Sequence, residues 1–448
     1  MTLFFAAKTG TALTALLIAL GTPATTTSPA QATAASPQAA AAPVPAGVTS
    51  AQTDALRRQA GWRAAWMAAP QRASTGFEPN WSEEGFSGQS VRQIVRLTAG
   101  GSSLRIRLSN DYGPSPVHLT GATVAYAGQG ASLQPGSIHR LTFGSAPSAD
   151  LPAHGALTSD PVRLRIEPFQ SVAVTLYFAG TTGPATFHSQ AYATSYRAQG
   201  DHAADTTATA FTQSTHSWYY LSRVDVTGGK DQQGKAVVTF GDSITDGFGS
   251  TNDANNRYPD ELAEQLAARG APRPVLNAGI GGNLVLNDSA WYGDRSAARF
   301  RRDALDQPGV GTVIILQGVN DIGFSESDTP TYKPAPVVSA DELIAGHRRL
   351  IRQAHAKGIK VVGATLLPFK GSDHWGAHAA AVSDAVNEWI RTSGEYDAVV
   401  DLDRALAAPD DPDVLNPAYD SGDHLHPNNA GYTAMARHIT DKLTSTTK

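Results

Sequence analysis

A serine, an aspartate and a histidine in two short polar segments have the residue types needed for nucleophilic catalysis. Ser243 lies in Gly241-Asp242-Ser243-Ile244, and Asp423 and His426 lie three residues apart near the C-terminus. A serine hydroxyl is a weak nucleophile until a neighbouring base removes its proton, and histidine does this when a carboxylate fixes its tautomer. Positions three apart in a helix-like turn face the same side. The spacing therefore predicts that Asp423 and His426 present acid and base to Ser243.

Two further segments could stabilise the negative charge that such an attack creates. They read Gly279-Ile280-Gly281-Gly282-Asn283 and Gly318-Val319-Asn320-Asp321. Because glycine lets the backbone approach a ligand closely, the Gly282 N–H group is a candidate donor. The Asn320 side-chain amide and the Ser243 N–H group would supply two more donors. We predict an oxyanion hole made of Ser243, Gly282 and Asn320.

The residues around these segments predict the elements that position them. From about residue 235, short apolar strands alternate with amphipathic helices, which is typical of parallel βαβ units in an open three-layer sheet. The expected strands are Ala236–Phe240, Val275–Ala278, Thr312–Leu316, Lys360–Thr365 and Ala398–Leu402. The expected helices are Tyr258–Arg269, one that Ser339 and Glu342 cap before Leu343, and one with Met435, Ile439 and Leu443 on its apolar face. Since ligands bind outside the carboxyl ends of such strands, the polar segments should meet at one edge of the sheet.

The four segments, in this order, resemble the signature blocks of the SGNH/GDSL hydrolase superfamily. The resemblance covers roughly residues 235 to 445, and the first block reads Gly-Asp-Ser-Ile where many members have Gly-Asp-Ser-Leu. It implies a flavodoxin-like α/β three-layer fold with a parallel sheet. It also implies that Ser243 is the nucleophile, that Gly282 and Asn320 are oxyanion donors, and that Asp423 and His426 complete the triad. The chain is also similar to exported bacterial members with a β-rich domain before the hydrolase domain, some of which are carbohydrate acetylesterases.

The preceding region, residues 56–228, has the pattern of an all-β domain. Apolar and polar residues alternate in several segments separated by turn-forming clusters: Ser90–Leu97, Ser103–Asn110, Val162–Ile166 and Ser171–Phe178. Such alternation is typical of half-buried antiparallel strands. Many short strands with regular turns predict a β-sandwich, jelly-roll-like in form.

The first 55 residues have the composition of an export signal and a linker. An apolar run from Thr11 to Leu20 precedes Ala30-Gln31-Ala32, a signal-peptidase pattern, although Lys8 is the only charge before the run. The run is too short to cross a bilayer. We therefore predict a signal peptide at 1–32, a linker rich in Ala, Pro, Ser and Thr at 33–55, and a secreted protein without a transmembrane anchor after cleavage.

Composition narrows the possible partners and chemistry. The formal net charge is -5 and the isoelectric point is about 6.2, which argues against a nucleic-acid partner. The chain has no cysteine, so disulfides and thiolate chemistry are excluded. Asp423, His424 and His426 could suggest zinc, but a catalytic zinc needs three converging ligands and an open position. We expect no metal and no cofactor.

Several other polar and aromatic residues allow two interpretations. His424 is expected to face solvent, and Asp246 to stabilise its own turn. Four aromatic residues near connecting segments could line an acyl or sugar pocket or simply pack in the core: Trp291, Tyr292, Phe369 and Trp375. Four tryptophans of the β-rich region could be stacking platforms for glycans or core residues: Trp62, Trp66, Trp81 and Trp218.

Together these observations predict a secreted serine carboxylester hydrolase that acts through an acyl-enzyme. Short acyl esters of carbohydrates, such as an acetylated polysaccharide, are the expected substrates. Lipid esters, cleaved by a lipase or lysophospholipase, are the first alternative. A carbohydrate-binding protein with a degenerate hydrolase domain is an alternative of another class.

Overall fold

The computed structural model describes residues 61–229, 234–328, 330–333 and 335–445. These residues all belong to one compact unit, Gln59–Lys448. The predicted signal peptide and linker lie outside the described residues. Among those residues, no helix is long and apolar enough to span a membrane.

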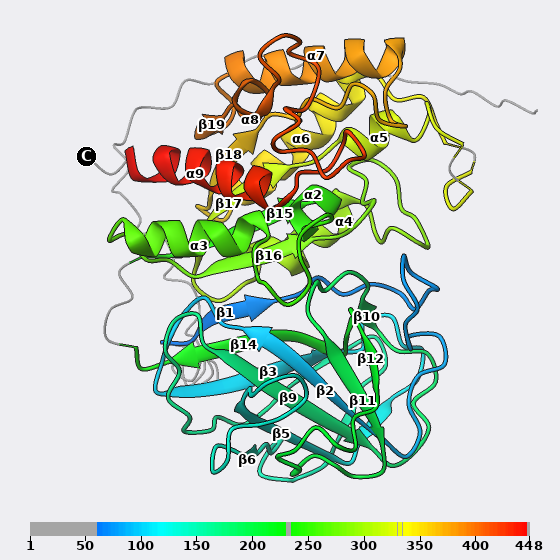
Figure 1. Ribbon diagram of the computed structural model, residues 1–448, viewed down its shortest axis with the longest axis vertical. Helices are drawn as coiled ribbons and strands as arrows, with labels where there is room; N and C mark the ends of the chain where they lie inside the picture. Colours follow the sequence, from blue (N-terminus) through cyan, green and yellow to red (C-terminus); the bar gives the residue numbers. More distant parts are fainter. Residues whose placement is uncertain (1–60, 230–233, 329, 334, 446–448) are drawn as a thin grey trace, which may run out of the picture. The chain divides into compact units, whose positions relative to one another are not determined.

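The C-terminal part is built on a parallel sheet of five strands in the order β16-β15-β17-β18-β19 (Figure 1). All four neighbouring pairs are parallel. The strands are β15 (Ala236–Gly241), β16 (Val275–Gly279), β17 (Val310–Leu316), β18 (Lys360–Ala364) and β19 (Ala398–Val400). The apolar runs therefore predicted the sheet. The last strand is shorter than expected, because Asp401 caps a new helix that begins at Leu402.

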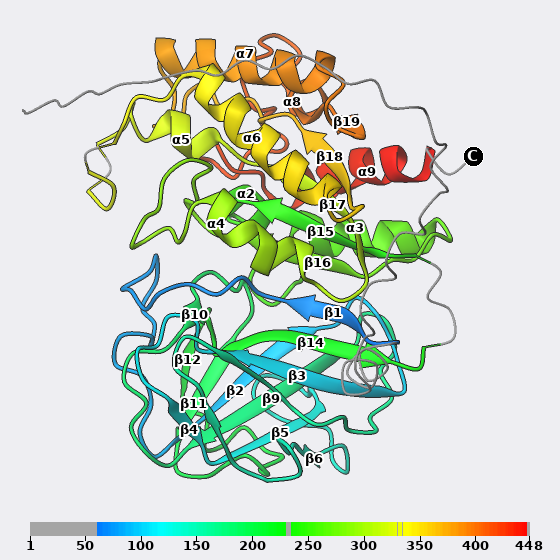
Figure 2. The same ribbon diagram turned by 180° about the vertical axis from the view of Figure 1, so that it is seen from behind.

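Helices cover both faces of this sheet and give the three layers expected of an SGNH-type α/β fold. Helices α3 and α9 lie on one face (Figure 1), and α4 and α6 lie on the opposite face (Figure 2). Their bounds are α2 (Ser243–Asp246), α3 (Tyr258–Ala268), α4 (Ser296–Phe300), α5 (Val319–Gly323), α6 (Ala340–His355), α7 (Ala377–Thr392), α8 (Leu402–Leu406) and α9 (Asn429–Ser445). A short π-helical turn, η1 (Arg301–Leu305), continues α4. Both hydrogen bonds of the predicted capping box between Ser339 and Glu342 are present.

The N-terminal part is β-rich, with two larger antiparallel sheets whose apolar side chains form one core. One sheet has the order β1-β14-β3-β8, and the other β12-β11-β2-β9-β5-β6; the pairs β4-β7 and β10-β13 are separate. The strands are β1 (Arg63–Met67), β2 (Gln89–Arg96), β3 (Ser103–Ser109), β4 (Val117–Leu119), β5 (Gly121–Tyr126), β6 (His139–Arg140), β7 (Ala149–Leu151), β8 (Ala156–Thr158), β9 (Ser171–Phe178), β10 (Phe187–His188), β11 (Ser195–Gln199), β12 (Gln213–Thr215), β13 (Trp218–Tyr219) and β14 (Leu221–Thr227).

One predicted strand is wrong. Residues 162–166 form no continuous ladder; Val162 and Ile166 make only isolated bridges, to Leu104 and Gly101. Leu164 and Ile166 are buried while Arg163 and Arg165 are exposed. The alternation therefore reflects burial of one side of the segment, which an irregular backbone can also achieve.

The β-rich part contacts the parallel sheet at its edge strand, β16. The Thr98 hydroxyl accepts a hydrogen bond from the Val275 N–H group at 3.1 Å and lies 3.0 Å from the Val275 carbonyl oxygen. Ala64 and Met67 of β1 belong to the hydrophobic core of the C-terminal part. Because an uncovered edge strand invites pairing with other chains, this contact protects the sheet.

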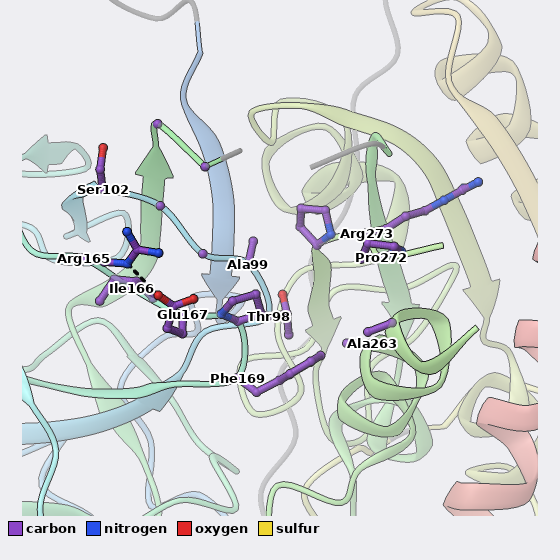
Figure 3. A pocket seen from close by; sticks show the side chains of 17 residues that line it. Thr98, Ala99, Ser102, Arg165, Ile166, Glu167, Phe169, Ala263, Pro272 and Arg273 are labelled. Carbon is purple, nitrogen blue, oxygen red and sulfur yellow. Dashed lines mark hydrogen bonds and ion pairs between the residues drawn. The ribbon is translucent and has the colours of Figure 1, made fainter. Parts of the chain in front are cut away.

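A cavity of about 390 Å³ opens beside this contact, near the amino end of β16. Figure 3 shows Phe169 and Ala263, from the two parts of the chain, among its lining side chains. Three of the polar segments identified in the sequence follow the opposite, carboxyl ends of the strands, and the fourth precedes α9. The cavity is therefore not part of the candidate site.

Candidate active site

Ser243 is the first residue of α2, directly after β15. A Cβ atom at Gly241 would lie 2.1 Å from the Thr245 hydroxyl and 2.4 Å from the Leu316 carbonyl oxygen, so only glycine permits this tight strand-to-helix turn. The Asp242 carboxylate caps α2 by accepting the Ile244 N–H group at 3.1 Å. Because Ser243 is the first residue of the helix, its N–H group has no acceptor within the helix and can bind a ligand.

The three predicted triad residues form a continuous chain of hydrogen bonds. Ser243 Oγ lies 2.7 Å from His426 Nε2, and His426 Nδ1 lies 2.6 Å from Asp423 Oδ2. An ionised carboxylate can only accept, so Nδ1 carries a proton and Nε2 is free to accept the serine proton. Ser243 is only 7% exposed, so little water competes for its hydroxyl. The arrangement is that of a nucleophile with its base and the group that orients the base.

The segment that carries the acid and base is not helical, which corrects the geometry assumed from the sequence. Asp423 Oδ1 accepts the backbone N–H groups of Leu425 and His426, at 3.0 and 2.8 Å. This turn leaves Oδ2 for the His426 ring. Burial alone would raise the pKa of Asp423, but the bonds from His426 and Leu425 hold it well below its ordinary value. The carboxylate is therefore ionised at any working pH.

The Gly282 backbone has a conformation and surroundings that only glycine tolerates. Its φ is +72°, and a Cβ atom there would lie 2.2 Å from the Tyr292 ring. No hydrogen bond from the Gly282 N–H group is seen among residues 61–229, 234–328, 330–333 and 335–445. This donor is thus available to a ligand.

The Asn320 side chain is buried at the start of α5 and fixed by two neighbours. Its Nδ2 donates to the Asn283 carbonyl oxygen at 3.2 Å, and its Oδ1 accepts from His374 Nε2 at 3.3 Å. The first bond uses one of the two amide hydrogens and leaves the other for a ligand. Burial, together with nearby His426, lowers the pKa of His374 to about 4, so its ring is neutral at neutral pH.

Arg299 lies beneath the site and ties its segments together. Its side chain has no exposed surface, and it donates to the carbonyl oxygens of Gly241 and Ala278, both at 2.8 Å, and to Asn283 Oδ1 at 2.8 Å. Both carbonyls belong to strand ends that carry site residues. This role could not be predicted from the sequence, because a single arginine in a helix is usually at the surface.

His424 and Asp246, for which the sequence predicted no catalytic role, make specific contacts in the structure. His424 is exposed and pairs with Asp420 at 2.7 Å, so it faces away from Ser243 as expected. Asp246 does more than stabilise its own turn. Its carboxylate binds His188 of the β-rich part and the Gly281 N–H group. Among the described residues, no group of three or more His, Asp or Glu side chains could hold a metal ion.

The aromatic residues divide between the site and the cores. Tyr292 packs on Gly282 and contacts Phe324, whereas Phe369 is in the core of the C-terminal part with Trp375 against it. Trp291 packs beside Tyr292. Three tryptophans of the β-rich part are buried in its core, which excludes them as glycan platforms: Trp66, Trp81 and Trp218. Trp62 lies under Arg105.

The fold and the site together define the class of protein. A serine that follows a strand of a parallel α/β sheet and is hydrogen-bonded to a histidine, which is in turn bonded to an aspartate, is the arrangement found in serine hydrolases. Residues 239–434 match the GDSL-like Lipase/Acylhydrolase family. This part of the chain therefore belongs to the SGNH/GDSL hydrolase superfamily, as its four blocks indicated.

Solved structures with a similar fold include three enzymes that match less than half of this chain. An acetylxylan esterase from Geobacillus stearothermophilus is 24% identical, with 48% of this chain and 95% of that chain covered and a TM-score of 0.36. A GDSL-like lipase from Bacteroides thetaiotaomicron is 19% identical (47% and 89% covered, TM-score 0.35). An alpha/beta hydrolase enzyme from the metagenome of Lake Arreo, Spain, is 24% identical (47% and 95% covered, TM-score 0.36). No curated protein matches the chain.

Proposed function

We propose that the protein is a secreted serine carboxylester hydrolase that acts through an acyl-enzyme. The hydrogen-bonded chain from Asp423 through His426 to Ser243 carries this proposal, because each bond has the direction that proton transfer from the serine requires. The proposal includes export by the signal peptide at 1–32. It also includes a β-sandwich as the form of the β-rich part, at 56–228, followed by the hydrolase domain at 235–445.

In the first half of the reaction, Ser243 Oγ attacks the ester carbonyl carbon and His426 Nε2 takes the hydroxyl proton. Asp423 stabilises the imidazolium that forms. The tetrahedral intermediate collapses when the carbon–oxygen bond to the alcohol breaks, and His426 gives its proton to that alcohol. Water then attacks the acyl-enzyme by the same route, and the acid leaves while Ser243 regains its proton.

The negative charge of the intermediate would be held by the N–H groups of Ser243 and Gly282 and by the Asn320 amide. These donors are fixed before substrate arrives, so they need no reorganisation during the reaction. Removal of one such donor typically costs about 2.7–4 kcal/mol of the barrier. This contribution can be measured separately from the triad.

We propose short acyl esters of carbohydrates as the substrates. Tyr292 packs directly on Gly282, which leaves little room for a long acyl chain beside that donor. Two of the large apolar side chains exposed among the described residues flank the site: Phe77, 42% exposed, contacts Tyr292, and Phe248, 36% exposed, lies against His426. Exposed rings at a rim suit the flat face of a sugar. The same apolar rim favours lipid esters as the second candidate.

Hydrolysis of p-nitrophenyl esters from acetate to palmitate, with Ser243→Ala as the control, tests the proposal. We expect turnover confined to short chains and a loss of about 10⁴-fold or more in the variant, with an unchanged melting temperature. A preference for long chains would favour lipid esters. If the variant keeps ordinary activity, the acyl-enzyme mechanism is wrong. Absence of serine-dependent turnover, with retention of the full chain on insoluble xylan or cellulose, would favour the binding protein.

A further inference from the structure

A buried ion pair joins the β-rich part to the helix that carries Ser243. His188 Nε2, at the end of β10, lies 2.9 Å from Asp246 Oδ1 of α2, and the two side chains are 4% and 1% exposed. His188 Nδ1 lies 2.9 Å from the Ala69 carbonyl oxygen, and the Trp218 ring stacks on the imidazole. Since a carbonyl and an ionised carboxylate both only accept, this geometry requires a proton on each ring nitrogen.

The charge state agrees with this geometry. Burial by itself would lower the pKa of His188, but the Asp246 carboxylate outweighs burial and raises that pKa above its ordinary value. Arg257 also lies close enough to Asp246 to interact with it electrostatically, but its guanidinium is hydrogen-bonded to Asp260. Loss of His188 would therefore leave the buried Asp246 carboxylate without a directly bonded cation, which is unfavourable. The pair is therefore a fixed attachment between the two parts at neutral pH.

Asp246 also binds the segment 279–283, which contains the proposed oxyanion donor Gly282. Its second oxygen, Oδ2, accepts the Gly281 N–H group at 3.0 Å, and its own carbonyl oxygen accepts from the Asn277 side chain at 3.3 Å. Gly281 directly precedes Gly282. Three of the five residues from Gly279 to Asn283 are glycines, so this segment loses much backbone conformational entropy when it adopts one conformation. Contacts with other segments are therefore needed to hold its N–H groups in place.

The β-rich part also fits against the outer side of this segment. A Cβ atom at Gly281 would lie 1.9 Å from Gln190 Oε1 and 3.0 Å from the Phe77 ring, and both side chains belong to the β-rich part. Gln190 is itself buried. The segment is thus held between Asp246 on one side and residues of the β-rich part on the other.

From these contacts we infer that His188 is a positioning residue for the oxyanion hole, so that the β-rich part forms a piece of the ester site. The inference rests on the proposed function. His188 acts through Asp246, which holds Gly281 and hence the Gly282 donor. Since a misplacement of about 1 Å can cost on the order of 10²-fold in rate, loss of this contact should lower kcat.

The test compares His188→Ala and His188→Gln with a matched variant at the same contact surface, Thr98→Val. Thr98 binds the amino end of β16, whereas Gly281 follows its carboxyl end. We expect His188→Ala to lower kcat for p-nitrophenyl acetate by about 10-fold or more, with KM changed less than about threefold. His188→Gln, which can still donate to Asp246, should recover part of the loss. Thr98→Val should keep kcat even where it lowers the melting temperature.

Hydrogen exchange of the peptide that covers residues 279–286 gives a readout that does not depend on activity. We expect faster exchange in His188→Ala than in the wild type and in Thr98→Val. Unchanged exchange and kcat in a folded His188→Ala protein would overturn the inference, as would an equal loss of kcat in Thr98→Val. If His188→Ala does not fold, unchanged exchange and kcat in His188→Leu, which fills the space without a donor, would overturn it. If the wild type shows no serine-dependent turnover, the proposed function fails, and exchange alone still decides whether His188 holds this segment.

Discussion

The two segments that we propose to form the oxyanion hole with Ser243 are held by different parts of the molecule. Gly282 offers a backbone N–H group, and its neighbour Gly281 is held by Asp246, which His188 of the β-rich part binds. Arg299 holds the two ends of the same segment from within the hydrolase part. Asn320 offers a side-chain amide, which His374 of the same part holds directly. A backbone donor moves whenever its chain segment moves, whereas a side-chain donor needs only its own rotamer fixed. Mutations far from the active site should therefore displace the Gly282 donor more readily than the Asn320 donor.

The largest effect should follow removal of the side-chain donor itself. Asn320→Ala should lower kcat/KM for p-nitrophenyl acetate by about 10²–10³-fold, because one oxyanion donor is lost. The melting temperature should fall by several degrees, since the Asn283 carbonyl and the His374 ring lose a buried hydrogen-bond partner. Steady-state kinetics with Asn320→Asp as a second variant would check this. A loss smaller than about threefold would remove Asn320 from the oxyanion hole.

A smaller effect should follow removal of the group that orients this amide. His374→Ala should lower kcat by about 10-fold with little change in KM, because the Asn320 amide becomes free to rotate. In the Asn320→Ala background, the same change should cost almost nothing, since its target is gone. This double-mutant cycle separates orientation of Asn320 from any direct role of His374. Full additivity of the two losses would contradict it.

Asp321 links the two segments by hydrogen bonds, and its contribution to the free energy of unfolding should depend on pH. The Asp321 carboxylate accepts the N–H groups of Val285 and Leu286, at 2.8 and 3.0 Å, and burial raises its pKa to about 7. An unfolded aspartate ionises near pH 4, so the wild type loses stability as pH rises from about 4 to about 7. Asp321→Asn lacks this loss.

Urea unfolding at pH 5 and pH 8 measures this difference. The variant should be less stable than the wild type at pH 5, because an amide oxygen replaces only one of two acceptors. That deficit should shrink by on the order of 2–3 kcal/mol at pH 8. A deficit that stays constant across this range would show that Asp321 is ionised in the folded protein throughout.

The smallest effect on the kinetic constants should follow mutation of Phe77, one of the exposed aromatic residues beside the site. Phe77→Ala should raise KM about two- to fivefold and leave kcat unchanged, since an exposed ring contributes binding that is equal in the ground and transition states. Val337, another exposed apolar residue, provides the control: Val337→Ala should change neither constant. A fall in kcat for Phe77→Ala would instead place Phe77 among the groups that hold Gly281.

Local patterns predicted the sheet, the three polar segments at its strand ends and the fourth before α9 for physical reasons. Buried parallel strands are short apolar runs, and their carboxyl ends are the places where polar residues meet. This rule located Ser243, and the residue types and spacing of Asp423 and His426 grouped them with it from sequence alone. The helical turn assumed for the last two was wrong, because the Asp423 carboxylate organises the turn by binding backbone N–H groups, a contact that residue spacing does not reveal.

The residues that position the site could not be predicted because their contacts are distant in sequence. His188 lies 58 residues before Asp246 and His374 lies 54 residues after Asn320. A lone histidine in a strand or loop gives no periodic signal. Asp246 was predicted to stabilise its own turn because only its near neighbours are visible in the sequence, whereas its carboxylate reaches a different part of the fold.

The contact of Thr98 with β16 has a consequence for biosynthesis. Residues 61–228 leave the ribosome before the parallel sheet does, and domains generally fold in this order. When β16 forms, a folded partner is already present to cover its edge. A hydrolase part made alone would have to assemble its sheet with that edge uncovered, so we expect it to accumulate as aggregates unless the preceding part is supplied.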